Sequence, residues 1–249
     1  MMLNGELTPE EFADTPYVYC NILTLDRKAY FVEEHIARLT ASATELFGED
    51  ITLAPRIIEQ QIATLLEANR ASRNNNVRVE VRLDAVGDLS LYCHEATIYA
   101  GYVMRPLRPE PYIYHCDMPL AAHSTSASQA TLLFAEAVAN ANGCGTALTT
   151  THDGHIVMEP SRPLFLIKQG YIASAAGPRS VEKMIIEKAA QAIGLKPLTI
   201  SLTASLLAEA DEVIIADWQC ITALSHHADH IYMDIVAGKI AKAAANLLR

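Results

Sequence analysis

The sequence predicts an α+β protein built from two lobes. Strand-like runs rich in β-branched residues occur in both halves, as in Tyr17–Thr24 and Glu212–Ala216. Apolar residues at helical spacing lie between them, as in Glu33–Leu46. Between the halves, Met104–Pro111 (MRPLRPEP) holds three prolines in eight residues, which continue neither a helix nor a central strand. We therefore expect a first lobe at 1–103, a linker at 104–111 and a second lobe at 112–249.

Composition narrows the class of protein. The chain has 249 residues, 51% of them hydrophobic, enough for two lobes with cores of their own. Its net charge of −10 and the absence of a basic block argue against nucleic acid as a partner. No apolar run is long enough to cross a membrane, and the acidic N-terminus is not a signal peptide. The five cysteines form no C-x-x-C pair, so we expect reduced thiols in a cytoplasmic protein.

The first lobe should be a sheet with two helices. Tyr17–Thr24 and Lys28–Val32 are predicted as strands joined by a turn at Leu25–Arg27. The helix Glu33–Leu46 follows, with Ile36, Leu39, Ala43 and Leu46 on one face. The remaining predicted elements of this lobe are a helix at 55–69 and strands at 74–82 and 90–103, the last divisible into two.

The second lobe alternates helices and strands. A helix at 128–142 precedes two apolar runs that flank Asp153-Gly154, a dipeptide suited to a tight hairpin turn. The second run ends in Val157-Met158-Glu159, and another strand, Leu164–Ile167, follows. The rest is predicted as strands at 171–174, 199–202 and 212–216, helices at 181–193 and 234–248, and short strands before the last helix.

Glu159 is a lone carboxylate between two predicted core strands. It has two interpretations. It is either a strand-end residue in water or a carboxylate that faces the nitrogen of a cofactor.

A more specific pattern lies in the first predicted helix. EEHIARLTASA matches H-x-x-R-L-x-x-S-A through the residues His35, Arg38, Leu39, Ser42 and Ala43. Together with the strand, D-G turn and "V-x-E" described above, it resembles the fold-type IV enzymes that use pyridoxal phosphate. These are the class IV aminotransferases, which include D-amino-acid and branched-chain aminotransferases and aminodeoxychorismate lyase. The resemblance covers essentially the whole chain after residue 12.

The resemblance implies a fold, an assembly and roles for residues. It implies the two-lobed fold-type IV architecture with a cleft between the lobes, and a homodimer. Arg38 would grip the phosphate of the cofactor, because a guanidinium forks around such a group. Glu159 would pair with the ring nitrogen and keep it protonated. Tyr17 would line the substrate pocket, although an ordinary strand aromatic is an equal interpretation.

The chain departs from the family at its defining lysine, which forms the Schiff base with the cofactor. Counted back from Gly143, the matching position is Thr125, and no lysine occurs between Lys28 and Lys168. A slip of two residues places His123 there instead. Without an amine at this position there is no covalent attachment and no base for the substrate.

The phosphate-binding segments are altered too. Where the family has "G-I-T-R", this chain has Ser180, Val181, Glu182 and Lys183, and Asp217 stands in a turn that is normally rich in Thr or Ser. Like charges about 4 Å apart repel by roughly 4 kcal/mol at an effective dielectric near 20, so Glu182 and Asp217 disfavour a phosphate. Either carboxylate could instead pair with Arg38. Glu182 could also be a simple first-turn acid, which the helix dipole favours.

Histidines gather at Ser225–His230, where three imidazoles and a carboxylate could hold a metal. Next to Ile231–Met233 the segment is more typical of a turn into a strand, with His226 and His230 on one face and His227 on the other. We therefore expect no metal site here.

Three functions are compatible with these residues. The first is a class IV aminotransferase relative with a degenerate cofactor site, without bound cofactor, that holds a small, carboxylate-bearing ligand through Arg38 and Tyr17. The second is an enzyme that uses pyridoxal or pyridoxamine phosphate without the lysine, with His123 as the base. The third is a non-catalytic dimeric partner of another protein.

Overall fold

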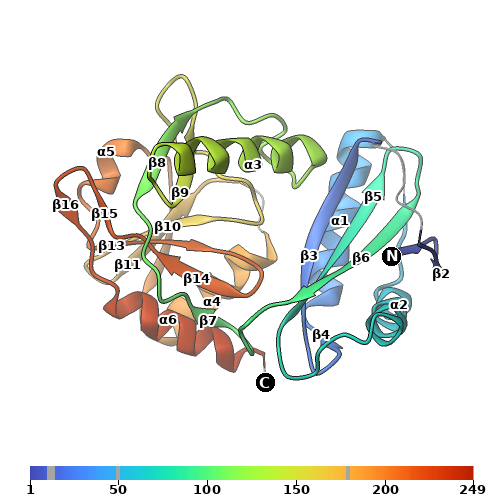
Figure 1. Cartoon of the computed structure of the whole chain (residues 1–249). Helices are drawn as coiled ribbons and strands as arrows, with labels where there is room; N and C mark the ends of the chain where they lie inside the picture. Colours follow the sequence, from blue (N-terminus) through green and yellow to red (C-terminus); the bar gives the residue numbers. More distant parts are fainter. Residues whose placement is uncertain (10–14, 49–50, 178–179, 249) are drawn as a thin grey trace. The chain divides into compact units, whose positions relative to one another are not determined.

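The computed structural model describes residues 1–9, 15–48, 51–177 and 180–248. They form two compact units. The first unit comprises Met1–Gly101 together with Ser124–Ser126, and the second comprises Tyr102–His123 and the chain from Ala127 onward. Figure 1 labels the helices and strands of both.

The first unit is built on a six-stranded sheet with the order β2-β1-β6-β5-β3-β4. Its centre is three long antiparallel strands, β3 (Tyr17–Leu25), β5 (Val77–Asp84) and β6 (Leu89–Ala96). The short strands β1 (Met2–Leu3), β2 (Glu6–Leu7) and β4 (Lys28–Ala29) complete it. Alternate residues of β5, from Val77 to Leu83, are fully buried in the core, as expected for a sheet covered on one face.

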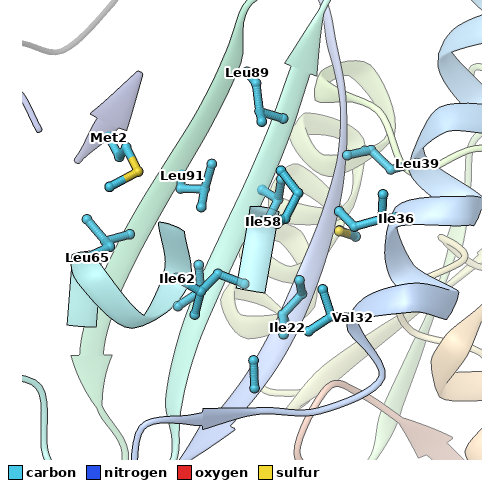
Figure 2. Packing of buried hydrophobic residues seen from close by; sticks show 14 of the residues in the cluster. Met2, Ile22, Val32, Ile36, Leu39, Ile58, Ile62, Leu65, Leu89 and Leu91 are labelled. Atoms are coloured by element: carbon cyan, nitrogen blue, oxygen red, sulfur yellow. The ribbon is translucent and has the colours of Figure 1, made fainter. Parts of the chain in front are cut away.

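Two amphipathic helices cover that face. They are α1 (Val32–Phe47) and α2 (Pro55–Ala68), and each buries one stripe of apolar side chains. Figure 2 shows Ile36 and Leu39 of α1 and Ile58 and Ile62 of α2 packed with strand residues such as Leu91.

The second predicted strand is shorter than expected. The sequence predicts Lys28–Val32, but β4 ends at Ala29 and α1 begins at Val32. Phe31 has a left-handed backbone, with φ 56°, which ends the strand and starts the helix. The turn before β4 is confirmed: Asp26 and Arg27 both have positive φ, as in tight hairpin turns.

The second unit is layered around another six-stranded sheet, with the order β12-β11-β10-β13-β14-β7. Helices α4 (Val181–Ala192) and α6 (Ile235–Asn246) pack on each other, and α6 also lies against the strands β7, β13 and β14. On the other side, the parallel pair β8 (Pro111–His115) and β9 (Thr146–Thr150) carries α3 (Ser126–Ala141). Figure 1 shows α3 and α6 on opposite sides of this unit. Its other elements are β7 (Val103–Met104), β10 (Leu164–Lys168), β11 (Tyr171–Ala175), β12 (Lys196–Ile200), α5 (Ala204–Leu207), β13 (Glu212–Ala216) and β14 (Cys220–Ala223).

Two of the three prolines in 104–111 lie between β7 and β8 of the second unit, and the third, Pro111, begins β8. Met104 pairs with Ile221 at the edge of the large sheet, and Pro111 pairs with Thr146 at the start of β8. The predicted strand 90–103 is thus divided between β6 and β7. The lobe boundaries proposed from the sequence remain a prediction.

The hairpin at Asp153-Gly154 forms, but its second strand does not. The N–H of Gly154 donates to the carbonyl of Thr151 at 2.9 Å, and Ile156 forms an isolated bridge with Thr150. The prediction of a strand that ends in Val157-Met158-Glu159 is wrong, although the N–H of Val157 still donates to the carbonyl of Thr149 at 3.0 Å. Pro160 and Pro163 lack the N–H groups a central strand needs, and the chain turns there before β10.

The histidine-rich segment is a small hairpin. β15 (His226–His227) pairs with β16 (His230–Ile231), and Ala228 in the turn has φ 50°. The predicted turn into a strand at Ile231 is present, but the alternation of faces expected from His226 to His230 does not hold, because the chain reverses at Ala228. Within the described ranges, no cluster of three His, Cys, Asp or Glu side chains is placed to hold a metal ion.

Among the helices that the structure describes, none combines the length and apolar character needed to cross a membrane.

Helix α2 offers a matched test of the first core. Ile62 is fully buried and Ile57 is 54% exposed on the same helix. We expect Ile62→Ala to lower the free energy of unfolding by about 2–5 kcal/mol, because it leaves a cavity, and Ile57→Ala by less than about 1 kcal/mol. Chemical denaturation measures both values. Equal losses would contradict the burial of this helix face.

Candidate functional site

Glu159 is fully buried at the turn that precedes β10. One carboxylate oxygen accepts hydrogen bonds from the Ser161 backbone N–H at 2.8 Å and from the Ser161 hydroxyl. Its carbonyl accepts from the N–H of Arg162 at 2.8 Å, which fixes the turn. The interpretation of Glu159 as a strand-end residue in water is therefore wrong.

The first turn of α4 carries a second buried carboxylate. Ser180 caps the helix, and its side chain accepts from the N–H of Lys183 at 3.1 Å. Val181 and Glu182 follow, each less than 5% exposed. The ammonium of Lys183 donates to the carbonyl of Ala175 at 2.8 Å.

The carboxylates of this unit act on one another. Burial, aided by the charges of Glu159 and Asp217, raises the pKa of Glu182 to about 8, and hydrogen bonds from its own backbone N–H and from Ser180 oppose this shift. The three acids that the sequence places at a cofactor site are thus gathered in one region of the second unit.

Asp217 is held in a closed polar cluster. Arg105 donates to its carboxylate at 2.8 Å and to the Cys220 sulfur at 2.8 Å. The N–H groups of Gln219 and Cys220 donate to the same carboxylate at 2.9 and 3.0 Å. The hydroxyl of Tyr102 lies 3.1 Å from the carbonyls of Asp217 and Cys220.

The cation that pairs with Asp217 is therefore Arg105. The sequence offered Arg38 only as an alternative partner of Glu182 or Asp217, and it missed Arg105, which lies in the proline-rich stretch. Burial raises the pKa of the Cys220 thiol strongly, and the Asp217 charge adds to the shift, so the sulfur stays protonated.

A cavity of about 100 Å³ lies beside these groups within the second unit. Its polar lining comes from Glu159, Ser174, Ser180 and Lys183, and the rest is mostly apolar, with Ile156, Leu164 and Leu202 among the residues. Ser174 is 2% exposed, and its hydroxyl has no hydrogen-bond partner in the part of the chain that the structure describes.

His123 is also in the second unit. It is 4% exposed, its backbone N–H donates to the carbonyl of Leu120 at 2.8 Å, and its carbonyl accepts from the Ser128 hydroxyl at 3.3 Å.

The other predicted site residues belong to the first unit. Thr125 is 3% exposed and bridges Val18 of β3. The N–H of Tyr19 donates to the carbonyl of Ser124 at 2.9 Å, so 124–126 run beside β3. Tyr17 starts the same strand, and its ring lies 4.5 Å from the Arg82 guanidinium carbon.

Arg38 lies on α1. Burial lowers the pKa of its guanidinium, and the nearby charge of Glu45 opposes the shift. A guanidinium stays charged at neutral pH even so, so Arg38 keeps the charge that an anion site needs.

Most of the chain matches one family of proteins. Residues 18–217 match the family model described as amino-transferase class IV. The chain belongs to this family. A search of curated protein sequences finds no match.

Solved structures of class IV aminotransferases share the fold at low sequence identity. A candidate 4-amino-4-deoxychorismate lyase from Legionella pneumophila is 14% identical with a TM-score of 0.80, over 98% of this chain and 97% of that one. A branched-chain aminotransferase from Thermoproteus uzoniensis, solved with norvaline, is 15% identical with a TM-score of 0.78, over 98% and 92% of the two chains. A hypothetical aminotransferase from Mycobacterium tuberculosis in its PLP-bound form is 13% identical with a TM-score of 0.80, over 96% and 93%. The same description is given to a form with α-ketoglutarate and PMP bound.

These likenesses confirm the fold-type IV α+β architecture of this class IV family member. Two of these solved structures, both of the hypothetical aminotransferase from Mycobacterium tuberculosis, hold PLP or PMP.

The buried Glu182 should make the free energy of unfolding of this protein depend on pH. Its pKa of about 8 lies above the ordinary value of 4.5, so between these values the folded chain holds a proton that the unfolded chain has lost. The free energy of unfolding should therefore fall as pH rises through this range. Glu182→Gln should be more stable than the native chain by on the order of 2–4 kcal/mol near pH 8, with little difference near pH 4.5.

Denaturation of both proteins across this pH range measures the difference. Glu209→Gln, at a carboxylate whose side chain is 61% exposed, is the control and should show no such trend. A stability difference for Glu182→Gln that does not change with pH would contradict the burial of a protonated acid.

Proposed function

We propose that this chain is a class IV aminotransferase family member without standard transaminase chemistry, and that it binds a small, carboxylate-bearing ligand instead of using pyridoxal phosphate. Thr125 carries this proposal. It stands where the family has its lysine, and a hydroxyl forms no Schiff base. Its neighbours Ser124 and Ser126 carry no amine either, so shifting this assignment by one residue brings no lysine to the position.

The phosphate side of the site supports the same interpretation. Glu182 occupies the first turn of the helix whose N–H groups cup phosphate in the family, and it is 3% exposed. A phosphate placed there would lie against Glu182, while Arg105 is already engaged by Asp217. On these grounds we infer that the residues do not fit pyridoxal phosphate.

Titration with pyridoxal phosphate tests the proposal. The native protein should show no saturable change in the absorbance of the cofactor, and borohydride reduction followed by peptide mapping should find no modified lysine. Lys183 is the residue to watch, because its amine lines a cavity in the second unit. A stoichiometric adduct on Lys183 or any other native lysine would overturn the proposal.

Thr125→Lys is the matched gain-of-function variant, and Thr125→Ser is its control. An adduct on residue 125 in the first variant alone would establish the register. Above pH 8, where Glu182 is ionised, the double variant Thr125→Lys with Glu182→Thr should bind the cofactor more tightly than Thr125→Lys, since it removes a like charge beside the phosphate.

Saturable binding without any adduct would favour a different function. It would indicate an enzyme that works on pyridoxal or pyridoxamine phosphate without the lysine, with His123 as the base. Relatives of the same fold bound to either form of the cofactor are what favours this candidate. Loss of the chemistry, but not of the binding, in His123→Ala would then assign the base.

The assembly follows from family membership as a proposal. We expect a homodimer, and sedimentation equilibrium would measure it. A monomer at micromolar concentration would argue against it. A dimer that binds neither the cofactor nor small carboxylates would favour the third function, a non-catalytic partner protein.

A further inference from the structure

The face of the first unit's sheet that points away from its core carries polar and aromatic side chains. In β5 the valines alternate with Arg78, Glu80 and Arg82, so these three share the face opposite the core. Glu80 pairs with Tyr92 of β6 and with Asn21 of β3 in the antiparallel register. The face also receives Tyr17 and His94, which contact the arginines.

Glu80 is the centre of this group and is 1% exposed. Arg82 donates to it through Nε at 2.6 Å, His94 lies 3.3 Å away, and Arg78 lies 4.0 Å away. Burial alone would raise the pKa of Glu80, but hydrogen bonds from His94 and Arg82 and the charges of both arginines lower it to about 2. Two guanidiniums thus surround the carboxylate of Glu80, while Asp84 at the end of the strand accepts a hydrogen bond from the Thr15 hydroxyl at 3.0 Å.

Arg82 is held rigidly within this face. Its guanidinium carbon lies 4.5 Å from the centre of the Tyr17 ring and 4.2 Å from that of Tyr92, so it is stacked between the two. Its side chain remains 27% exposed. Among the residues with described positions, Arg82 donates a hydrogen bond to Glu80, through its Nε atom. Its two terminal nitrogens therefore remain able to donate to another acceptor.

Asn21 adds an unmet acceptor nearby. It is 6% exposed, and its Oδ1 atom has no hydrogen-bond partner in the described ranges. It is the diagonal neighbour of Arg82 across β3 and β5, since Tyr19 is the direct partner of Arg82. A buried carbonyl without a donor is costly, so a donor from a bound molecule would be favoured here.

We propose that this face binds a small molecule with an oxyanion, held by the terminal nitrogens of Arg82, and a hydroxyl or amino group that donates to Asn21. The terminal nitrogens match the two oxygens of a carboxylate or phosphate, and the flanking tyrosines restrict the guanidinium before binding. The proposal deepens the proposed function, on which it rests, because it assigns the group that would hold its ligand. It assigns Arg82, where the sequence suggested Arg38.

Calorimetric titrations without pyridoxal phosphate test this. The probes are succinate, L-malate and inorganic phosphate, added separately to the full chain. We expect saturable binding of malate more tightly than succinate, because only malate offers a hydroxyl to Asn21. Tighter binding of phosphate than of either acid would identify a phosphate group as the oxyanion.

Variants assign the contacts. Arg82→Gln should weaken binding by about 10-fold or more, because a charge-assisted hydrogen bond is lost. The double variant Arg82→Gln with Glu80→Gln removes one positive and one negative charge together. It should weaken binding as much as Arg82→Gln alone. Asn21→Leu should abolish the preference for malate over succinate. Arg56→Gln removes the same charge from an exposed position of α2 and should have little effect.

The results separate this inference from the proposed function. Unchanged binding in both Arg82 variants, or no binding of any probe at millimolar concentration, would overturn the assignment of Arg82. A lysine adduct with pyridoxal phosphate would instead overturn the proposed function, and the effect of the Arg82 variants on anion binding would still be measurable.

Discussion

A carboxylate removed from water must find a cation or take up a proton, and this constraint organises both units of the chain. The first unit buries Glu80 among Arg78, Arg82 and His94, and the acid stays charged. The second unit buries Glu182 near two further acids, and the pKa of Glu182 rises to about 8. One fold therefore contains a cation-rich face and an acid-rich region, and the two favour opposite kinds of ligand charge.

The regular elements of the fold were predictable because their hydrophobic periods are clear. Of the predicted stripe of α1, Ile36, Leu39 and Ala43 are buried and Leu46 is partly buried, and the β-branched run 17–24 forms β3. The failures have local causes. Pro160 and Pro163 remove N–H groups from an otherwise strand-like sequence, and the left-handed backbone of Phe31 ends β4 early. Neither effect appears in a periodicity of apolar residues.

The site was predictable in part for a different reason. Motif positions single out Glu159, Glu182 and Asp217, and in the structure the charges of Glu159 and Asp217 act on Glu182. Their role at a cofactor stays a prediction. The partner of Asp217 was not predictable, because Arg105 lies in a proline-rich stretch more than a hundred residues away. The Arg82 cluster had a usable signal. Charged residues at every second position of VRVEVRL mark a strand whose outer face is built for charge.

The connectivity of the two units affects how such a protein can change by recombination. Ser124–Ser126 belong to the first unit, although the chain on either side of them belongs to the second. No single breakpoint in a gene separates the units. A cut at residue 101 leaves Ser124–Ser126 with the second unit, and a cut at residue 126 leaves Tyr102–His123 with the first. Residue 125 can therefore change by a single codon. A new first unit, in contrast, cannot be acquired in one exchange unless Ser124–Ser126 are replaced with it.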